Sequence, residues 1–385
     1  MTRAIVLPRH APAQRQRGAA FLVLVLMIGI VGTALIVSAG TSKNDKLGAA
    51  ENTAKALATA RDALIAFAVS VPDSARPGDL PCPATDYNTG TAAASCNTSA
   101  SRQGYLPWST LGIPKLLDGS GAPLLYAVSN IYKNSTRVPT SLANALNSDQ
   151  SGEFSVDGEN AIAVVFAPGP PIGTQNRNAG TFSLSNFLEL GNADGNTSFQ
   201  NSAESATIND RLIWITPRAF FPPIEMRALR VAQAQLQNYF SVTGRYPMSN
   251  RYQDDYSCWT NGGRLPYEVA GNPCLPGGNG ATAGQWTSAW PAWFFSNYWD
   301  YVFHYAVAQR CTTNPGTICG GSGNYLTLNG TDGMRVILIR QGIPNGQTRP
   351  CSLVSQCLDD VENRDSDRDY ITPVAGNDKL TLVAP

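Results

Sequence analysis

Histidine is nearly absent from this sequence, which has only His10 and His304 among its 385 residues. A serine or cysteine nucleophile needs a general base beside it, and His10 lies in a short basic segment at the start of the chain. The sequence also lacks GxSxG, HExxH, Walker-loop and GxGxxG motifs in a supporting context. We therefore expect that the chain is not an enzyme.

Charged residues are few as well, at 15% of the chain, with 28 basic and 28 acidic side chains. A net charge of zero provides no electrostatic attraction for nucleic acid, so no nucleic-acid partner is expected. Glycine and proline are abundant, with 35 and 26 residues, which is typical of a loop-rich body that contains β-structure. The length allows about two domains.

One long uncharged stretch, residues 19–42, interrupts this pattern. About twenty helical residues suffice to cross a bilayer core of roughly 30 Å, so the stretch predicts a single membrane span. No proline occurs between Pro12 and Pro72, so one long helix is expected, with a membrane half and an amphipathic half. By the positive-inside rule, four preceding arginines keep the N-terminus in the cytoplasm and the body outside it: Arg3, Arg9, Arg15 and Arg17.

The start of this stretch resembles a known processing site. Arg17-Gly18 followed by Ala19-Ala20-Phe21-Leu22-Val23 looks like the leader junction of type IV pilins and type II secretion pseudopilins. The resemblance implies cleavage by prepilin peptidase between Gly18 and Ala19, N-methylation of Ala19, and packing of the apolar helix against other pilins or pseudopilins. Val23 departs from the family, whose fifth mature residue is usually glutamate, and in this it resembles minor subunits at or near a filament tip. An uncleaved signal anchor on an unrelated exported protein is the alternative.

All eight cysteines follow the apolar stretch, where the predicted topology places them in an oxidising compartment. No CxxC spacing occurs and the body has one histidine, so disulfides are favoured over zinc. The sequence leaves the connectivity open, and sequential pairing is our prediction: Cys82 with Cys96, Cys258 with Cys274, Cys311 with Cys319, and Cys351 with Cys357.

The body contains an internal repeat. Two helical segments, 43–71 and 227–240, place apolar residues in the same pattern at an offset of 172 positions: Leu57, Ala60, Leu64 and Phe67 against Leu229, Ala232, Leu236 and Tyr239. Each helix is followed by a cysteine pair, a Gly-x-Leu-Pro turn and strand candidates in one order: 124–129, 161–166 and 211–216, then 305–307, 336–339 and 379–383. Agreement in residues and order predicts a duplicated unit.

The predicted fold class is therefore α+β. A long N-terminal helix, with a membrane half and an amphipathic half, would lie on a small, mostly antiparallel sheet, followed by a second pilin-like helix-plus-sheet unit. The expected domains are a prepilin leader (1–18), a transmembrane and assembly helix (19–42), a first globular domain (43–217), a linker (218–223) and a second globular domain (224–385).

Acidic residues alternate near the C-terminus, at Asp365, Asp367 and Asp369. Oxygen ligands spaced by two on a turning loop suit calcium, and the resemblance adds that some pseudopilins hold calcium in a loop between late strands. The loop lacks the twelfth-position glutamate of an EF-hand. A solvated acidic turn, neutralised by Arg364 and Arg368, is the alternative. Calcium is the one cofactor that the sequence suggests.

An aromatic run, residues 286–305, holds four of the seven tryptophans. Aromatic faces stack on sugars or fill a partner's groove, so the run is a candidate adhesive surface. We favour a core position under the second helix, because the run leads directly into the 305–307 strand.

These features predict a minor pilin or pseudopilin, a structural subunit at or near the tip of a type IV pilus or a type II secretion pseudopilus. Its expected location is the inner membrane as a single-pass protein with a periplasmic body, and after assembly a periplasmic pseudopilus or extracellular pilus. The expected partners are the inner membrane, prepilin peptidase and other pilins or pseudopilins. A filament-borne adhesin that binds a surface or carbohydrate is the alternative, and a membrane-anchored exported enzyme is the third.

Overall fold

The structure is a computed structural model that describes residues 42–133, 144–178, 182–250, 252, 262–267, 286–312, 319, 323–365 and 367–385. Its contacts divide the chain into two units, Met1–Leu47 and Gly48–Pro385. The second unit contains all the sheets described below, and within it we call residues 48–216 the first repeat and residues 217–385 the second repeat.

Helix α2 (Ser42–Ser70) buries one face in the core. Its core face consists of Leu57, Ala60, Leu64 and Ala68, none of them more than 5% exposed. Phe67, predicted on this face, is only half-buried, because Ala68 stands four residues after Leu64 and takes the next core position. Proline at position 72 follows the end of the helix, in keeping with its poor fit inside one.

The predicted fold class is wrong in its first element. A long helix with a membrane half is not seen: α2 begins at Ser42, and among the described residues no helix has the length and apolarity needed to cross a membrane. The physical reason is the charge along α2, which includes Lys55, Arg61 and Asp62. The predicted localisation as a single-pass inner-membrane protein is corrected by the same finding. The predicted leader, 1–18, and residues 19–41 of the predicted membrane helix lie outside the described residues.

Each repeat contains a four-stranded sheet in which all neighbours are antiparallel. In the first repeat the strand order is β1-β2-β5-β7, formed by β1 (Gln103–Tyr105), β2 (Leu125–Val128), β5 (Ala163–Ala167) and β7 (Arg211–Ile215). In the second repeat the order is β8-β9-β12-β14, formed by β8 (Gly262–Arg264), β9 (Phe303–Val307), β12 (Val336–Arg340) and β14 (Lys379–Ala384). The two sheets therefore share one topology, and the predicted strands coincide with their three longest members.

Each repeat also has a small three-stranded sheet that the sequence did not predict. It combines one antiparallel and one parallel pair, with β3 between β4 and β6 in the first repeat and β10 between β11 and β13 in the second. The strands are β3 (Phe154–Val156), β4 (Glu159–Ala161), β6 (Ser198–Phe199), β10 (Leu326–Leu328), β11 (Thr331–Met334) and β13 (Asp369–Tyr370). Strands of two to four residues are too short to show a hydrophobic period.

Helix α3 (Pro217–Thr243) opens the second repeat. Residues 218–223, predicted as a linker, instead form its first turns, although Pro222 and Pro223 cannot donate helical hydrogen bonds. The side chain of Thr216 caps the helix by accepting from the Ala219 N–H, and the fully buried Phe220 and Phe221 hold this turn in the core. Further along, the predicted face of Leu229, Ala232, Leu236 and Tyr239 is buried as expected.

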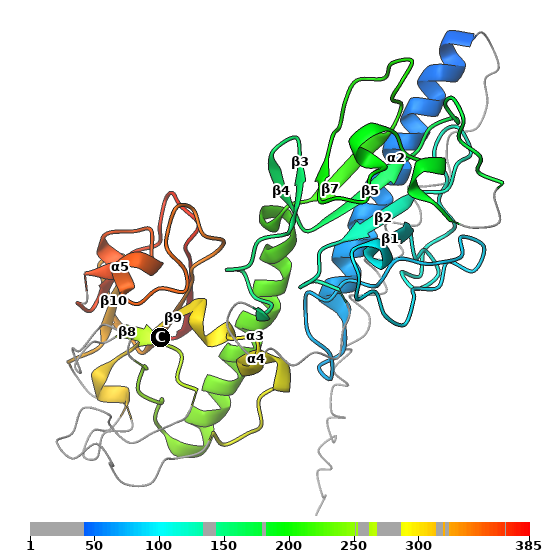
Figure 1. The fold of residues 1–385 in the computed structure, drawn as a ribbon. Helices are drawn as coiled ribbons and strands as arrows, with labels where there is room; N and C mark the ends of the chain where they lie inside the picture. The colour runs from blue at the N-terminus through cyan, green and yellow to red at the C-terminus, as the bar shows by residue number, and fades with distance from the viewer. Residues whose placement is uncertain are drawn as a thin grey trace, which may run out of the picture. The chain divides into compact units, whose positions relative to one another are not determined.

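The main hydrophobic core lies between these helices and the four-stranded sheets. Figure 1 shows α2 running along the sheet that contains β1, β2, β5 and β7. Two short helices, α4 (Ala292–Ser296) and α5 (Val354–Cys357), belong to the second repeat. A second apolar cluster fills the other face of the first sheet, beneath the small sheet, and includes Leu125, Phe166, Phe187 and Phe199.

Candidate functional site

Three disulfide bonds join cysteines in sequential pairs: Cys82 to Cys96, Cys311 to Cys319, and Cys351 to Cys357. These pairings agree with the prediction, while Cys258 and Cys274 lie outside the described residues. Disulfides persist in oxidising compartments, so they indicate an exported environment. The predicted cleavage and methylation residues, Gly18 and Ala19, are also outside the described part of the chain.

The acidic loop gathers three carboxylates, from Glu362, Asp365 and Asp367, with one oxygen of each within 4.8 Å of the others. Asp369, predicted as the third ligand, begins β13 instead, and its backbone N–H donates to the Asp367 carboxylate at 2.6 Å. Glu362 was missed because it stands in a short 3-10 helix (Glu362–Arg364), outside the alternating pattern.

The carboxylates of this loop lie close together and repel one another. Desolvation, followed by the charges of Asp365, Asp367 and other aspartates, raises the pKa of Glu362 above its ordinary value. A hard cation such as calcium would relieve this repulsion, and carboxylate oxygens are its preferred ligands. The three side chains therefore fit a cation in chemistry and spacing. A solvated acidic turn that binds no cation has the same features.

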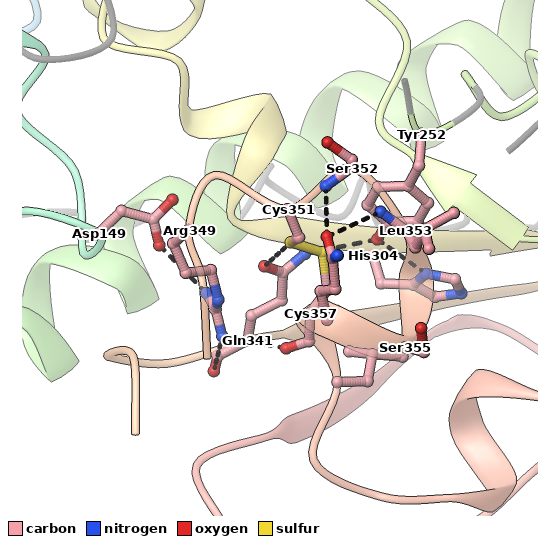
Figure 2. The surroundings of a disulfide bond; sticks show 12 residues. Asp149, Tyr252, His304, Gln341, Arg349, Cys351, Ser352, Leu353, Ser355 and Cys357 are labelled. Carbon is pink, nitrogen blue, oxygen red and sulfur yellow. Dashed lines mark hydrogen bonds and ion pairs between the residues drawn. A yellow bond between two sulfur atoms is a disulfide. The ribbon is translucent and has the colours of Figure 1, made fainter. Parts of the chain in front are cut away.

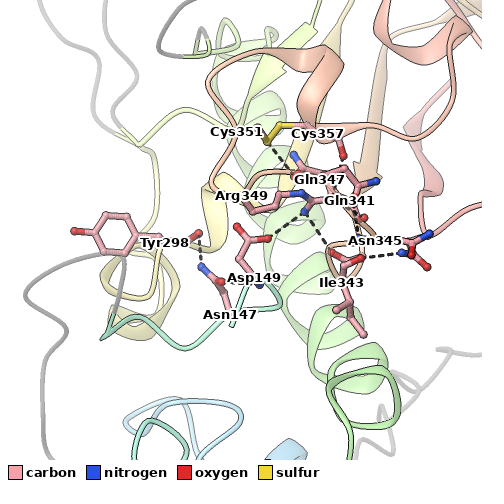
Figure 3. A network of polar contacts seen from close by, with 12 residues as sticks. Asn147, Asp149, Tyr298, Gln341, Ile343, Asn345, Gln347, Arg349, Cys351 and Cys357 are labelled. Carbon is pink, nitrogen blue, oxygen red and sulfur yellow. Dashed lines mark hydrogen bonds and ion pairs between the residues drawn. A yellow bond between two sulfur atoms is a disulfide. The ribbon is translucent and has the colours of Figure 1, made fainter. Parts of the chain in front are cut away.

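Arg349 joins the two repeats through a buried ion pair (Figure 3). Its Nη1 donates to Asp149 Oδ1 at 3.1 Å and to the Gly342 carbonyl at 3.3 Å, and its Nη2 donates to the carbonyls of Gln341 and Cys357 at 3.1 and 3.0 Å. The side chains of Arg349 and Asp149 are only 2% and 8% exposed. Burial raises the pKa of Asp149, and the charge of Arg349 opposes that rise.

Further polar contacts join the two repeats, one group of them at the C-terminal end of α2. Arg227 donates to the carbonyls of Val69 and Val71 at 2.7 and 2.6 Å, and to the Asp73 carboxylate at 2.7 Å. The Asn147 side chain donates to the Asn297 carbonyl at 2.9 Å. Satisfied polar groups of this kind fix the position of one surface on another.

A cleft of about 390 Å³ opens next to this interface. Its lining includes Asp149 and Glu159 from the first repeat, Arg218 at the start of α3, and Ile343 and Pro344 from the second repeat. Both signs of charge line it, and it has no histidine or cysteine, so its chemistry does not single out a metal or a nucleophilic reaction.

His304 is enclosed in the second repeat rather than placed on a surface (Figure 2). Its Nδ1 lies 3.1 Å from the Tyr252 hydroxyl and its Nε2 lies 3.4 Å from the Tyr370 hydroxyl. Burial lowers the pKa of His304 to about 4. A side chain at Gly262 would clash with the imidazole, so a glycine is needed there. By strand register, the apolar Leu125 occupies the equivalent position in the first repeat, opposite Phe166 as His304 is opposite Ile339.

The aromatic run contributes mainly to the core. Trp293, Phe294, Trp299 and Phe303 are at most 4% exposed. Trp286, Trp290 and Phe295 are half-buried and contact one another, with ring centroids 4.8 Å apart for the two tryptophans and 4.7 Å for Trp290 and Phe295. Within the described part of the chain, ring surface remains for a ligand at the edge of this cluster, at the neighbouring Tyr267, and at the half-buried Tyr298 and Tyr301.

Comparison with protein-family models, curated proteins and solved structures finds no match for this chain.

Proposed function

We propose that this chain is a minor pilin or pseudopilin, a structural subunit that is processed by prepilin peptidase and incorporated at or near the tip of a type IV pilus or type II secretion pseudopilus. The observation that carries the proposal is the arrangement that occurs twice, in which one helix packs on a four-stranded antiparallel sheet. In the first repeat that helix, α2, follows the apolar stretch that begins after Arg17-Gly18.

The double head supports a terminal position. A helical filament repeats one subunit along its length, and each added subunit must fit against its neighbours in the same way. A subunit that carries a second repeat after β7 has a second head, which must also be accommodated at every one of these contacts. Val23, in place of the glutamate usual at the fifth mature position, points the same way, because that acid serves the contact between successive shaft subunits in the family.

The disulfides support a function outside the cytoplasm. Three of them close short loops in the two repeats, with partners 14, 8 and 6 positions apart in the sequence. Such cross-links suit a head exposed to an oxidising compartment.

Labelling of assembled filaments tests the proposal. An epitope inserted after Val374, which is fully exposed in a turn before β14, leaves the core intact. We expect gold label at one end of a filament and none along its length. Label distributed along the shaft would contradict the tip position, and label absent from every filament would contradict the function. A matched epitope on a shaft subunit serves as the positive control.

A further inference from the structure

Two arginines occupy the same position in the two repeats. Arg177 of the first repeat donates to the backbone carbonyls of Gly169, Pro168 and Phe187 at 2.6, 3.5 and 3.4 Å. Arg349 of the second repeat donates to the carbonyls of Gly342, Gln341 and Cys357. In both repeats the first two carbonyls directly follow the third strand of the main sheet, β5 or β12. Each guanidinium therefore ties the same two loops together.

The two arginines differ at Nη1, which is the nitrogen that pairs with an acid in the second repeat. They also differ elsewhere, because Arg177 donates from Nε to the Asn186 carbonyl at 3.2 Å and from Nη2 to Gln175 Oε1 at 3.3 Å, whereas Nε of Arg349 has no partner within the described residues. Nη1 of Arg349 donates to Gly342 and also to the Asp149 carboxylate, whereas Nη1 of Arg177 donates to the Gly169 carbonyl alone. A guanidinium Nη1 carries two N–H groups, so one of them on Arg177 has no acceptor within the described residues. Nor does Arg177 form an ion pair with any residue that the structure describes.

The acids nearest to Arg177 accept hydrogen bonds from other donors. Asp118, Glu189 and Asp210 act on it electrostatically, but Asp118 accepts the Gly169 N–H, Glu189 accepts the Asn209 N–H and Asp210 accepts the Glu189 N–H through Oδ2. Oδ1 of Asp210 has no partner within the described residues, and Arg177 does not reach it. Desolvation is the largest influence on this guanidinium and lowers the pKa of Arg177. Arg177 is only half-buried, so a group from outside the chain can approach it.

The ion pair of Arg349 indicates the chemistry of such a group, which is a carboxylate. Its acid, Asp149, belongs to the preceding repeat, in the segment between β2 and β3. We propose that Arg177 binds a carboxylate presented by another pilin-like subunit, in the way that Arg349 binds Asp149 of the first repeat. This inference rests on the proposed function, because it assumes that pilin-like units meet one another outside this chain as they do within it.

The partner is a different chain rather than a second copy of this one. Asp149 of a second copy is already paired with that copy's own Arg349. The equivalent segment of the second repeat, between β9 and β10, is residues 308–325, and it contains no aspartate or glutamate. A second copy therefore offers no free acid in the position that the contact requires.

A pair of peptides tests the inference on the full-length protein. One peptide has the sequence of residues 145–153, which includes Asp149, and its matched control has asparagine in place of Asp149 while keeping Glu153. The Nε–H signals of the arginines are followed by NMR, with the Arg177 signal assigned by its loss in Arg177→Lys. We expect the aspartate peptide to shift the Arg177 signal saturably, to leave the Arg349 signal unchanged, and to bind at least tenfold more tightly than the asparagine peptide.

Equal binding of the two peptides, a shift confined to other arginines, or no shift up to about 10 mM peptide would overturn the inference. The comparison of peptides needs no variant, so it remains informative if Arg177→Lys folds poorly. In Arg177→Lys itself we expect weaker binding, because lysine keeps the charge and loses the fork of donors. Failure here with end-on filament labelling intact would reject the contact and leave the proposed function standing.

Discussion

Acid should destabilise the second repeat through His304. The imidazole is buried between two tyrosine hydroxyls, and burial holds its pKa near 4, against an ordinary value of 6.5. Between these values the unfolded chain binds the proton and the folded chain does not. The stability contributed by the neutral imidazole is therefore complete above pH 6.5 and is lost as the pH falls toward 4.

The size of the effect follows from the two pKa values. Linkage gives a loss of about 2 kcal/mol between pH 8 and pH 5, rising to about 3.4 kcal/mol below pH 4. Other buried groups act with the opposite sign in the same range. Burial raises the pKa of Asp210 and Asp300 to about 7 and that of Asp378 to about 6. The stability that these carboxyls contribute to the folded protein when protonated is therefore lost as the pH rises through those values. The contribution of His304 is therefore isolated by the difference in pH dependence between the unaltered protein and a His304 variant, and not by the pH profile of one protein.

Urea unfolding of the full chain at pH 5, 6 and 8 provides that difference. Two variants are compared with the unaltered protein: His304→Gln, which can still bond to a hydroxyl, and His304→Leu, which copies Leu125 of the first repeat. His304→Leu leaves the hydroxyls of Tyr252 and Tyr370 without this partner, which costs about 1–3 kcal/mol at every pH. Fluorescence of the buried Trp299 reports on the same repeat.

We expect both variants to be about 2 kcal/mol less sensitive to the change from pH 8 to pH 5 than the unaltered protein. A free-energy difference that stays constant across the three pH values would refute the reasoning, because it would show that His304 has the same pKa in the folded and unfolded states.

Two further outcomes are expected. Leu64→Ala on the core face of α2 should lower the free energy of unfolding by about 2–5 kcal/mol, whereas Asp62→Ala on its exposed face should change it by less than about 1 kcal/mol; similar losses from both would contradict the described orientation of α2. Calcium at 100 times its dissociation constant should stabilise the protein by about 2.7 kcal/mol in thermal melts, and Asp367→Asn should abolish that response; a melting temperature that chelator does not change would remove the cation site.

The sequence carried enough information for the long strands and for the core faces of α2 and α3, whereas the predicted membrane half of the N-terminal helix was wrong. Val164, Ile213 and Ile337 lie within runs of β-branched and aromatic residues, and those runs became β5, β7 and β12. Residues 218–223 were expected to form a linker because Pro222 and Pro223 signal a break, but they belong to α3. The burial of Phe220 and Phe221 beside these prolines depends on tertiary packing that no local pattern contains.

The polar sites were harder to predict for a similar reason. Arg349 and Arg177 act on backbone carbonyls, which every residue possesses, so no residue type marks the acceptors. The acidic loop was recognised, yet its third carboxylate came from Glu362 instead of Asp369, because a short 3-10 turn changes which side chains converge. His304 stood in a recognised aromatic run, but its two tyrosine partners come from segments 52 residues before it and 66 residues after it.

The measurement that tests the central claim most directly is mass spectrometry of the N-terminus. The protein would be purified from cells that contain prepilin peptidase and from cells that lack it. A pilin-like subunit should begin at N-methylated Ala19 in the first case and keep the residues up to Gly18 in the second. An N-terminus at Met1, or at a position other than Ala19, in cells that contain the peptidase would contradict the account.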